Sequence, residues 1–351
     1  MVATAPSGQP KLDQIPSEIP IGVDVGAGLV KLVAPNLQLR NPAKFVEVTR
    51  LEESLEAPDG GHFYYHSGDA QHLIGKQFLT GSLAYDHSPT THTKLSDDPR
   101  LKAEYCLHAV LGAIATLPHK PHWNLYLVLS NHQPDLFRPN LKAIEGKHVV
   151  SFGGKDNLPA RVNIRVGLVV PEGAGNYVYC AGNKILDSKQ HAISIDLGTS
   201  TVIASAFNPG GKLVFREVLL TGGCIDLLDA IASDPEIIKA IGTGKSGNIE
   251  LIRRAVESGS FCYGNGLVIP DFSGVYQRHL KTWLAARMRL AKKSLAEFVE
   301  HAQPGVVWGG GAELPGVAAM LASIGWQSVP DAGWINAIGL QKIAQGRLSN
   351  G

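Results

Sequence analysis

The amino-acid sequence predicts an α/β protein built from two lobes that begin alike. Short apolar runs typical of strands alternate with amphipathic stretches typical of helices over most of the chain. One phrase occurs twice, an apolar run that ends in Asp-x-Gly: PIGVDVGAG at 20–28 and AISIDLGTST at 192–201. A length of 351 residues, 44% of them hydrophobic, is enough to bury two cores. Together these features indicate a duplicated strand, turn and strand unit, one in each half.

The first half is expected to open with an arm and continue mainly as strands. Residues 1–19 are rich in Pro, Ser and small side chains, which predicts a flexible arm. Apolar periodicity predicts a helix over 99–117 that stops at Pro118. A second helix is expected at 134–146. Runs rich in β-branched and aromatic residues predict strands at 21–26, 29–34, 44–48, 62–68 and 123–130, within 148–154, and within 161–175 before a turn at Pro171.

The second half restarts with strand, turn and strand at 192–207. Apolar residues at helical spacing then predict helices over 224–241 and 274–302. The short run GVVW at 305–308 is expected to be a strand of the second sheet. Three glycines follow it, and we expect a helix to open near Ala312 with Pro315 in its first turn.

Composition excludes several classes of protein. The formal net charge is +1, from 32 basic and 31 acidic residues, so the chain as a whole is not expected to bind nucleic acid or a membrane surface directly. No apolar run approaches the ~18 residues that a membrane span requires. The four cysteines lie far apart without CxxC spacing, and no signal peptide precedes them. We therefore expect reduced thiols and a cytoplasmic location.

Two phosphate-binding motifs that the sequence superficially suggests do not fit. A dinucleotide-binding loop requires G-x-G-x-x-G running into a helix, but after Gly26 and Gly28 the third position is Lys31, within a strand-like run. The stretch IGTGKSGN at 241–248 lacks the glycine that a P-loop requires five residues before Gly244, where Lys239 stands. We interpret that stretch as a surface turn.

The repeated hairpins fit phosphate binding of another kind. A tight turn after Asp-x-Gly directs backbone N–H groups toward its tip, and two such tips facing each other would hold a polyphosphate from both sides. Asp24 and Asp196 would then share one cleft, which implies Mg²⁺ bound through water. The triplet Gly309, Gly310 and Gly311 leaves room for a flat group such as adenine. Taken singly, each of these motifs is more often only a turn or a loop.

Four stretches together resemble the actin-like ATPases of the actin, sugar-kinase and 70-kDa heat-shock chaperone superfamily. DVGAGLVK and DLGTSTV look like its two phosphate motifs, and GGGAEL like its adenosine motif. WINAIGLQKIA looks like the closing segment that returns to the first domain. GGGAEL, VVPEGAGNYV at 169–178 and the small size most resemble bacterial plasmid-segregation actins of the ParM/StbA type. The resemblance implies two ribonuclease-H-like domains around a nucleotide cleft: 20–190 with 335–350 returning to it, and 191–334.

The resemblance also implies a role for each site residue. Glu172 would orient the attacking water, and Lys31 would neutralise β- and γ-phosphate oxygens. Ala27 departs from the pattern, because actins often place there a Ser or Thr that touches the γ-phosphate. The remaining nucleotide contacts would be Gly26, Gly28, Gly198, Thr199, Ser200, Thr201, Gly309, Gly310, Gly311 and Glu313, with Asp226 on the ribose side. Taken alone, Glu172 could be a solvated turn residue and Lys31 a strand-edge lysine.

The function that the resemblance implies is ATP hydrolysis with Mg²⁺, coupled to self-association into filaments. Such filaments would segregate plasmid DNA through a DNA-binding adaptor protein. The alternative is a small-molecule kinase of the same superfamily. A kinase would require a general-base aspartate in a substrate pocket near the cleft, and the sequence offers no convincing one. A chaperone is disfavoured, because no substrate-binding region follows residue 346 in this sequence.

Overall fold

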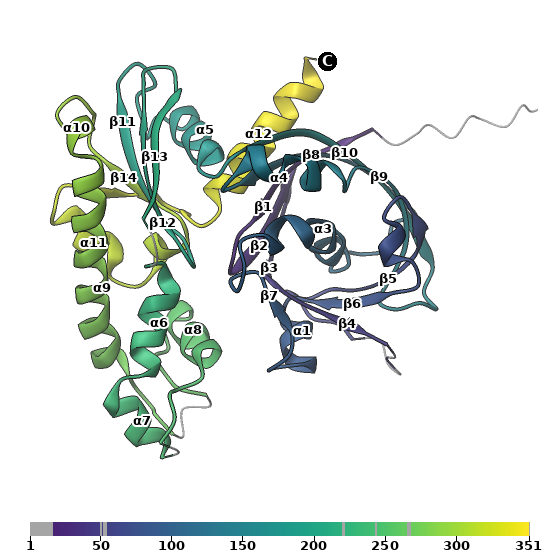
Figure 1. The fold of residues 1–351 in the computed structure, drawn as a ribbon, viewed down its shortest axis with the longest axis horizontal. Coiled ribbons are helices and arrows are strands. Elements are labelled where there is room, and N and C mark those ends of the chain that lie inside the picture. Colours follow the sequence, from purple (N-terminus) through teal and green to yellow (C-terminus); the bar gives the residue numbers. More distant parts are fainter. Residues whose placement is uncertain are drawn as a thin grey trace, which may run out of the picture.

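The computed structural model describes residues 17–49, 51, 55–219, 222–242, 244–264 and 268–350. Two sheets form the centres of two lobes, as the sequence predicts (Figure 1). The expected arm at 1–19 lies outside the described residues except for 17–19, and strand β1 already begins at Ile19. Within the described ranges, no helix combines the length and apolar character needed to cross a bilayer. All four cysteines are free.

The first sheet has ten strands in the order β3-β2-β1-β8-β10-β9-β5-β6-β4-β7. At its centre, β1 (Ile19–Val25) pairs in parallel with β8 (His122–Asn131), and β8 in parallel with β10 (Pro159–Pro171). The nearly continuous burial of β8 explains the apolar run Leu125–Leu129 at its centre. The other strands are β2 (Leu29–Ala34), β3 (Leu37–Pro42), β4 (Lys44–Val48), β5 (His62–Gly68), β6 (Gln77–Thr80), β7 (Thr93–Lys94) and β9 (Gly146–Phe152).

The sheet curves around helix α3 (Cys106–Ile114), all nine residues of which are buried (Figure 1). The single helix expected over 99–117 is divided, because Tyr105 leaves the helical conformation between α2 (Leu101–Glu104) and α3. Helix α4 (Pro134–Lys142) ends earlier than expected. The short helices α1 (Ser82–His87) and α5 (Ala174–Gly182) were not expected from the sequence.

The second sheet has five strands in the order β13-β12-β11-β14-β15. Its strands are β11 (Ala192–Leu197), β12 (Val202–Phe207), β13 (Leu213–Leu219), β14 (Val306–Trp308) and β15 (Gln327–Ser328). The strand expected at 305–308 is therefore confirmed as β14. Strand β11 pairs in parallel with β14 and antiparallel with β12, just as β1 pairs with β8 and β2. The two lobes thus begin with the same arrangement.

Helices of the second lobe are shorter than predicted because single residues outside the helical conformation interrupt them. Asp234 caps α7 (Pro235–Ile241) by accepting a hydrogen bond from the Glu236 amide, which separates α7 from α6 (Cys224–Ala232). The helix expected over 274–302 ends at Ser294 as α9 (Ser273–Ser294) and resumes as α10 (Ala296–Val299). The helix expected near Ala312 is only a 3₁₀ turn at Gly310–Glu313. Helix α11 (Val317–Ala322) begins only after Gly316, because Leu314 is extended (ψ 139°) and Gly316 is left-handed (φ 87°). Helix α8 (Ile249–Glu257) was not expected.

The last helix, α12 (Ile335–Ser349), returns to the first sheet. Leu340 and Ala344 of α12 are fully buried against Tyr126 and Val128 of β8. Glycine at position 22 allows this approach, because a Cβ there would lie 2.1 Å from the Ala337 carbonyl oxygen. Helix α12 therefore starts directly beside the carboxyl end of β1, between the lobes (Figure 1).

Candidate functional site

The two Asp-x-Gly turns have the same internal geometry. In the first, the Gly26 amide donates to the Leu29 carbonyl oxygen at 3.0 Å, and in the second the Gly198 amide donates to Thr201 at 2.9 Å. The two tips touch each other, because a Cβ on Gly28 would lie 2.5 Å from Thr199 Oγ1. The duplicated sequence thus produces a duplicated turn, and the lobes bring the two copies together.

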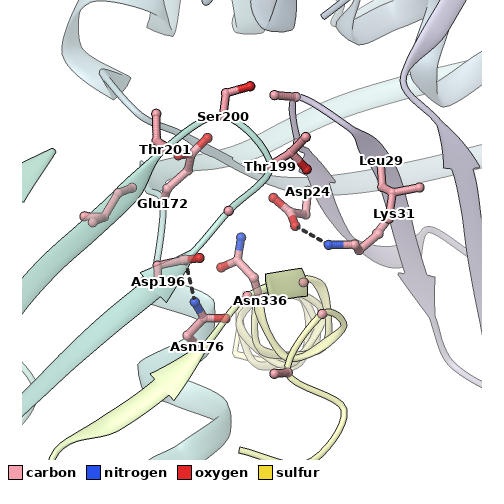
Figure 2. Close-up of a pocket in the computed structure, with 18 of the residues that line it drawn as sticks. Asp24, Leu29, Lys31, Glu172, Asn176, Asp196, Thr199, Ser200, Thr201 and Asn336 are labelled. Atoms are coloured by element: carbon pink, nitrogen blue, oxygen red, sulfur yellow. Dashed lines mark hydrogen bonds and ion pairs between the residues drawn. The ribbon is translucent and has the colours of Figure 1, made fainter. Parts of the chain in front are cut away.

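One cavity between the lobes, about 90 Å³ in volume, gathers most of the predicted site residues (Figure 2). Asp24 and Asp196 stand on opposite sides of it, and Asn336 of α12 stands between them. The predicted residues that line it are Asp24, Gly26, Ala27, Lys31, Glu172, Asp196, Gly198, Thr199, Ser200, Thr201, Gly309 and Gly310. Ligand pockets usually measure ~300–1,000 Å³, so a nucleotide would require this cleft to open further.

A second cavity of about 160 Å³ adjoins the first and shares Thr199 and Gly310 with it. Gly311 and Glu313 line this second cavity. Glu313 also fixes the turn before α12, since its carboxylate accepts a hydrogen bond from the Gly333 amide at 2.8 Å. Asp226 lines neither cavity, and its carboxylate instead pairs with Arg287 at 2.8 Å.

Asp196 is the acid of the cleft whose ionised form is disfavoured. Burial, followed by the nearby Glu172 and Asp24 carboxylates, raises the pKa of Asp196 to about 7. Its carboxylate accepts one hydrogen bond, from the Asn176 side chain at 3.3 Å. A buried carboxyl group beside two other acids is an arrangement that a cation would stabilise.

Asp24 and Lys31 face each other across the first hairpin. They are paired residues of β1 and β2, and Lys31 Nζ lies 3.5 Å from Asp24 Oδ2. Strand β2 lies between β1 and β3, and Lys31 is only 9% exposed. The interpretation of Lys31 as a strand-edge lysine is therefore wrong.

Glu172 lies at the end of β10 and is held in two ways. Its amide donates to the Asn131 carbonyl oxygen at 3.0 Å, and its carboxylate pairs with Lys102 Nζ at 2.7 Å. Burial raises the pKa of Glu172, but the Lys102 ammonium, with smaller contributions from His132 and Arg216, outweighs burial and leaves this pKa below its usual value. Glu172 is thus an enclosed, ionised acid and not a solvated turn residue.

Several polar groups in the cavity have no partner within the described part of the chain. Ser200 Oγ, Asn176 Oδ1 and Asn336 Oδ1 are buried without a hydrogen bond. The amides of Ala27 and Thr199 at the hairpin tips donate to no protein acceptor among the described residues. Unpaired buried polar groups are costly, so the site fits a ligand that supplies both acceptors and donors.

The donor set also fits Mg²⁺ held mainly through water. Carboxylate and amide oxygens are ligands that this ion accepts, and it dehydrates reluctantly. Among the described residues, no three His, Cys, Asp or Glu side chains gather closely enough to hold a metal by themselves. Phosphate oxygens and waters would therefore have to complete the coordination.

Three polar side chains of the cleft were not singled out from the sequence: Lys102, Asn176 and Asn336. Asn176 lies one helical turn after Glu172, on α5, within a stretch that already suggested the site. Asn336 is the second residue of α12, and its side-chain amide donates to Ser130 Oγ at 2.9 Å. Lys102 belongs to a helix that the sequence marks only by apolar periodicity. No local pattern distinguishes it, because its role depends on a residue 70 positions away.

Residues 22–175 match the family model described as the N-terminal domain of actin like proteins. The archaeal actin homolog Ta0583 superposes with a TM-score of 0.73 at 18% identity, over 94% of this chain and 99% of that one. ParM from a 15-stranded Clostridium botulinum filament superposes with a TM-score of 0.69 at 16% identity, over 94% of this chain and 99% of that one. Bacillus thuringiensis ParM with ATP superposes with a TM-score of 0.67 at 14% identity, over 95% of this chain and 100% of that one. No curated protein sequence matches this chain. The fold that the resemblance implied is confirmed: the chain has the two-lobed fold of the actin-like proteins, which it shares with the archaeal actin homolog and with ParM.

Proposed function

We propose that this protein binds ATP with Mg²⁺ between its lobes, hydrolyses it and assembles into nucleotide-dependent filaments. The observation that supports this most is the pair of matching hairpin tips that meet in one cavity with three carboxylates and two lysines. The solved structures with this fold include ParM with ATP and the archaeal homolog in complex with ADP. We propose the domain division 20–190 with 335–350, and 191–334, so that the cleft lies at the junction.

Most of the site residues would bind the nucleotide. The tips at 26–28 and 198–201 would hold the phosphates through their amides and hydroxyls. Gly310, Gly311 and Glu313 would lie along the base in the adjoining cavity, and Gly309 would approach it from the first cavity. Asp226 would contact the ribose only if its pair with Arg287 opened. Lys31 would turn from Asp24 toward phosphate oxygens.

Asp24 and Asp196 would hold the hydrated Mg²⁺, and Glu172 would act on water. When bound, Mg²⁺ would neutralise part of the negative charge of the phosphates. Glu172 would orient the attacking water by accepting a hydrogen bond from it, for which an ionised carboxylate is suited. The lowered pKa of Glu172 supports this role.

The cellular role that we propose is segregation of plasmid or other DNA in the cytoplasm through a DNA-binding adaptor. The support is the common fold with ParM, one solved form of which is a filament. The near-neutral charge gives no reason to expect direct binding of DNA or a membrane.

The proposal is tested by measuring thermal stability, phosphate release and light scattering on one preparation. ATP with Mg²⁺ should raise the melting temperature, because a ligand at ~100 times its dissociation constant adds about 2.7 kcal/mol to the free energy of unfolding. Scattering should rise with ATP, and electron microscopy should show filaments. Hydrolysis without assembly under several salt conditions would favour a small-molecule kinase instead, and no nucleotide effect at all would contradict the proposal.

A further inference from the structure

The first hairpin tip has no side chain that could recognise a terminal phosphate. Ala27 stands at its centre and lines the cavity with a methyl group. Lys31 is on the adjoining strand, but it faces Asp24. If the cleft binds both nucleotides, a cation beside the terminal phosphate, in addition to Lys31 and the hydroxyls of the second tip, would favour a triphosphate over a diphosphate.

Lys102 is a cation in the right position for this task. It comes from α2, a separate element of the first lobe, and lines the same cavity as Ala27, Thr199 and Ser200. Its side chain is 11% exposed and lies 2.7 Å from Glu172, its ion-pair partner. Because we propose Glu172 beside the attacking water, the Lys102 ammonium stands at the end of the cleft where the terminal phosphate would react.

The Lys102–Glu172 pair also limits what Glu172 can do. An oxygen of Glu172 that accepts a hydrogen bond from an ammonium at 2.7 Å is less available to accept one from water. A phosphate group carries more negative charge than a carboxylate and offers more acceptor oxygens, so it competes strongly for a lysine.

We propose that Lys102 senses the γ-phosphate: it exchanges Glu172 for the terminal phosphate of ATP and so frees Glu172 to orient water. This inference rests on the proposed function. With ADP bound, Lys102 would stay on Glu172 and the acid would remain engaged. With ATP bound, one ammonium would both hold the phosphate and release the acid, so only a triphosphate would complete the site.

The test is the affinity for a non-hydrolysable ATP analogue compared with that for ADP, each with Mg²⁺, by calorimetry. In Lys102→Met, affinity for the analogue should fall about 10-fold or more, as expected when a charge-assisted hydrogen bond is lost. Affinity for ADP should stay unchanged, which also shows that the variant folds. The control is Lys76→Met, which removes a solvent-exposed lysine–glutamate ion pair, with Glu47 at 3.2 Å, outside the cleft. It should change neither affinity.

A second variant examines the exchange itself. Glu172→Gln removes the competitor of the phosphate, so affinity for the ATP analogue should rise while affinity for ADP stays the same. That gain should vanish in the double variant Lys102→Met, Glu172→Gln. Lys102→Gln serves the same purpose as Lys102→Met if the latter does not fold.

Two results would overturn the inference. If Lys102→Met lowers the affinity for the ATP analogue and for ADP equally, or changes neither affinity, Lys102 does not sense the γ-phosphate and only holds Glu172. These results leave nucleotide binding by the wild type intact, so they differ from failure of the proposed function. In that other case the wild type would bind neither nucleotide.

Discussion

His108 is a buried histidine in the centre of α3. The aromatic rings of Phe45, Phe63, Phe78 and Tyr105 surround it, with ring centroids 4.5 to 6.3 Å away. Its Nδ1 has no hydrogen-bond partner among the described residues. Burial, with a small contribution from His72 and Lys76, lowers the pKa of His108 to about 3. The folded protein therefore holds this ring neutral over most of the acidic range.

This lowered pKa makes stability depend on pH in a definite direction. The unfolded chain binds a proton at His108 below about pH 6.5, whereas the folded protein does not, so stability is lost as pH falls from 6.5 toward 3. Between pH 7 and pH 5 the loss should be about 2 kcal/mol. We expect the free energy of unfolding, measured with urea, to fall between pH 7 and pH 5 by about 2 kcal/mol less in His108→Leu than in the wild type. The exposed control His87→Leu should behave like the wild type, and an equal loss in His108→Leu would contradict the assignment.

Asp196 is expected to lower the stability of the nucleotide-free protein and yet to contribute to the binding of ATP with Mg²⁺. Its raised pKa means that the folded protein loses stability as pH rises from about 4 to about 7, because the unfolded chain ionises this acid more readily. We expect Asp196→Asn, without nucleotide, to melt at a higher temperature than the wild type at pH 8. The same variant should lose most of the stabilisation by ATP with Mg²⁺. A lower melting temperature of Asp196→Asn without nucleotide would show that ionised Asp196 does not destabilise the folded protein.

At the scale of elements, the sequence predicts the parts whose signals are local. Both hairpins were predicted, because strand, Asp-x-Gly and strand are contiguous and their turns depend on nearby residues. The interruption at Asp234 could have been predicted from its Asp-Pro pair, a common helix start. The division of the 99–117 helix at Tyr105 could not, because it follows from the fit of α3 inside the curved sheet.

A contact between α1 and α8 joins the lobes away from the hairpins. Lys44 of β4 pairs with Glu250 at 2.8 Å and lies over the Tyr85 ring at 4.2 Å. Tyr85 of α1 in turn accepts a hydrogen bond from Asn248 at 3.3 Å. Glu250 also pairs with Arg253 and Arg254 of its own helix. The central cavity is smaller than a nucleotide, so we expect opening of the cleft to disturb this contact, which we call the α1–α8 latch.

The latch should limit the rate at which nucleotide leaves. Lys44→Met removes the bond between the lobes but leaves Glu250 paired within α8, so the fold should be kept. We expect nucleotide release to be about fivefold faster or more, corresponding to about 1 kcal/mol from one partly buried pair. Stopped-flow chase of a fluorescent nucleotide measures this rate. Lys76→Met is the control, and an unchanged rate in Lys44→Met would mean that the lobes part elsewhere.

At the scale of the whole molecule, the site depends on elements far apart in the sequence. The motifs predicted the two aspartates and the glycines, since each motif is complete within a few residues. They could not predict that α12 inserts Asn336 between the aspartates, or that α2 places Lys102 on Glu172. These contacts arise from how α2 packs against α3 and α4, and from how α12 packs on the first sheet. Side chains without a local motif therefore became visible only in the folded chain.

The coupling between hydrolysis and assembly can be tested through Glu172. If this acid only orients water, Glu172→Gln should slow phosphate release by about 10²-fold or more without weakening ATP binding. We propose that assembly follows ATP binding and disassembly follows hydrolysis, so filaments of the variant should persist longer than those of the wild type after free ATP is removed. Scattering and phosphate release on the same samples measure both effects. Asp196→Asn supplies the contrast, because a variant that does not bind ATP should not assemble at all. Slow hydrolysis with an unchanged filament lifetime would separate the two processes, and disassembly would then have to depend on nucleotide release through the α1–α8 latch.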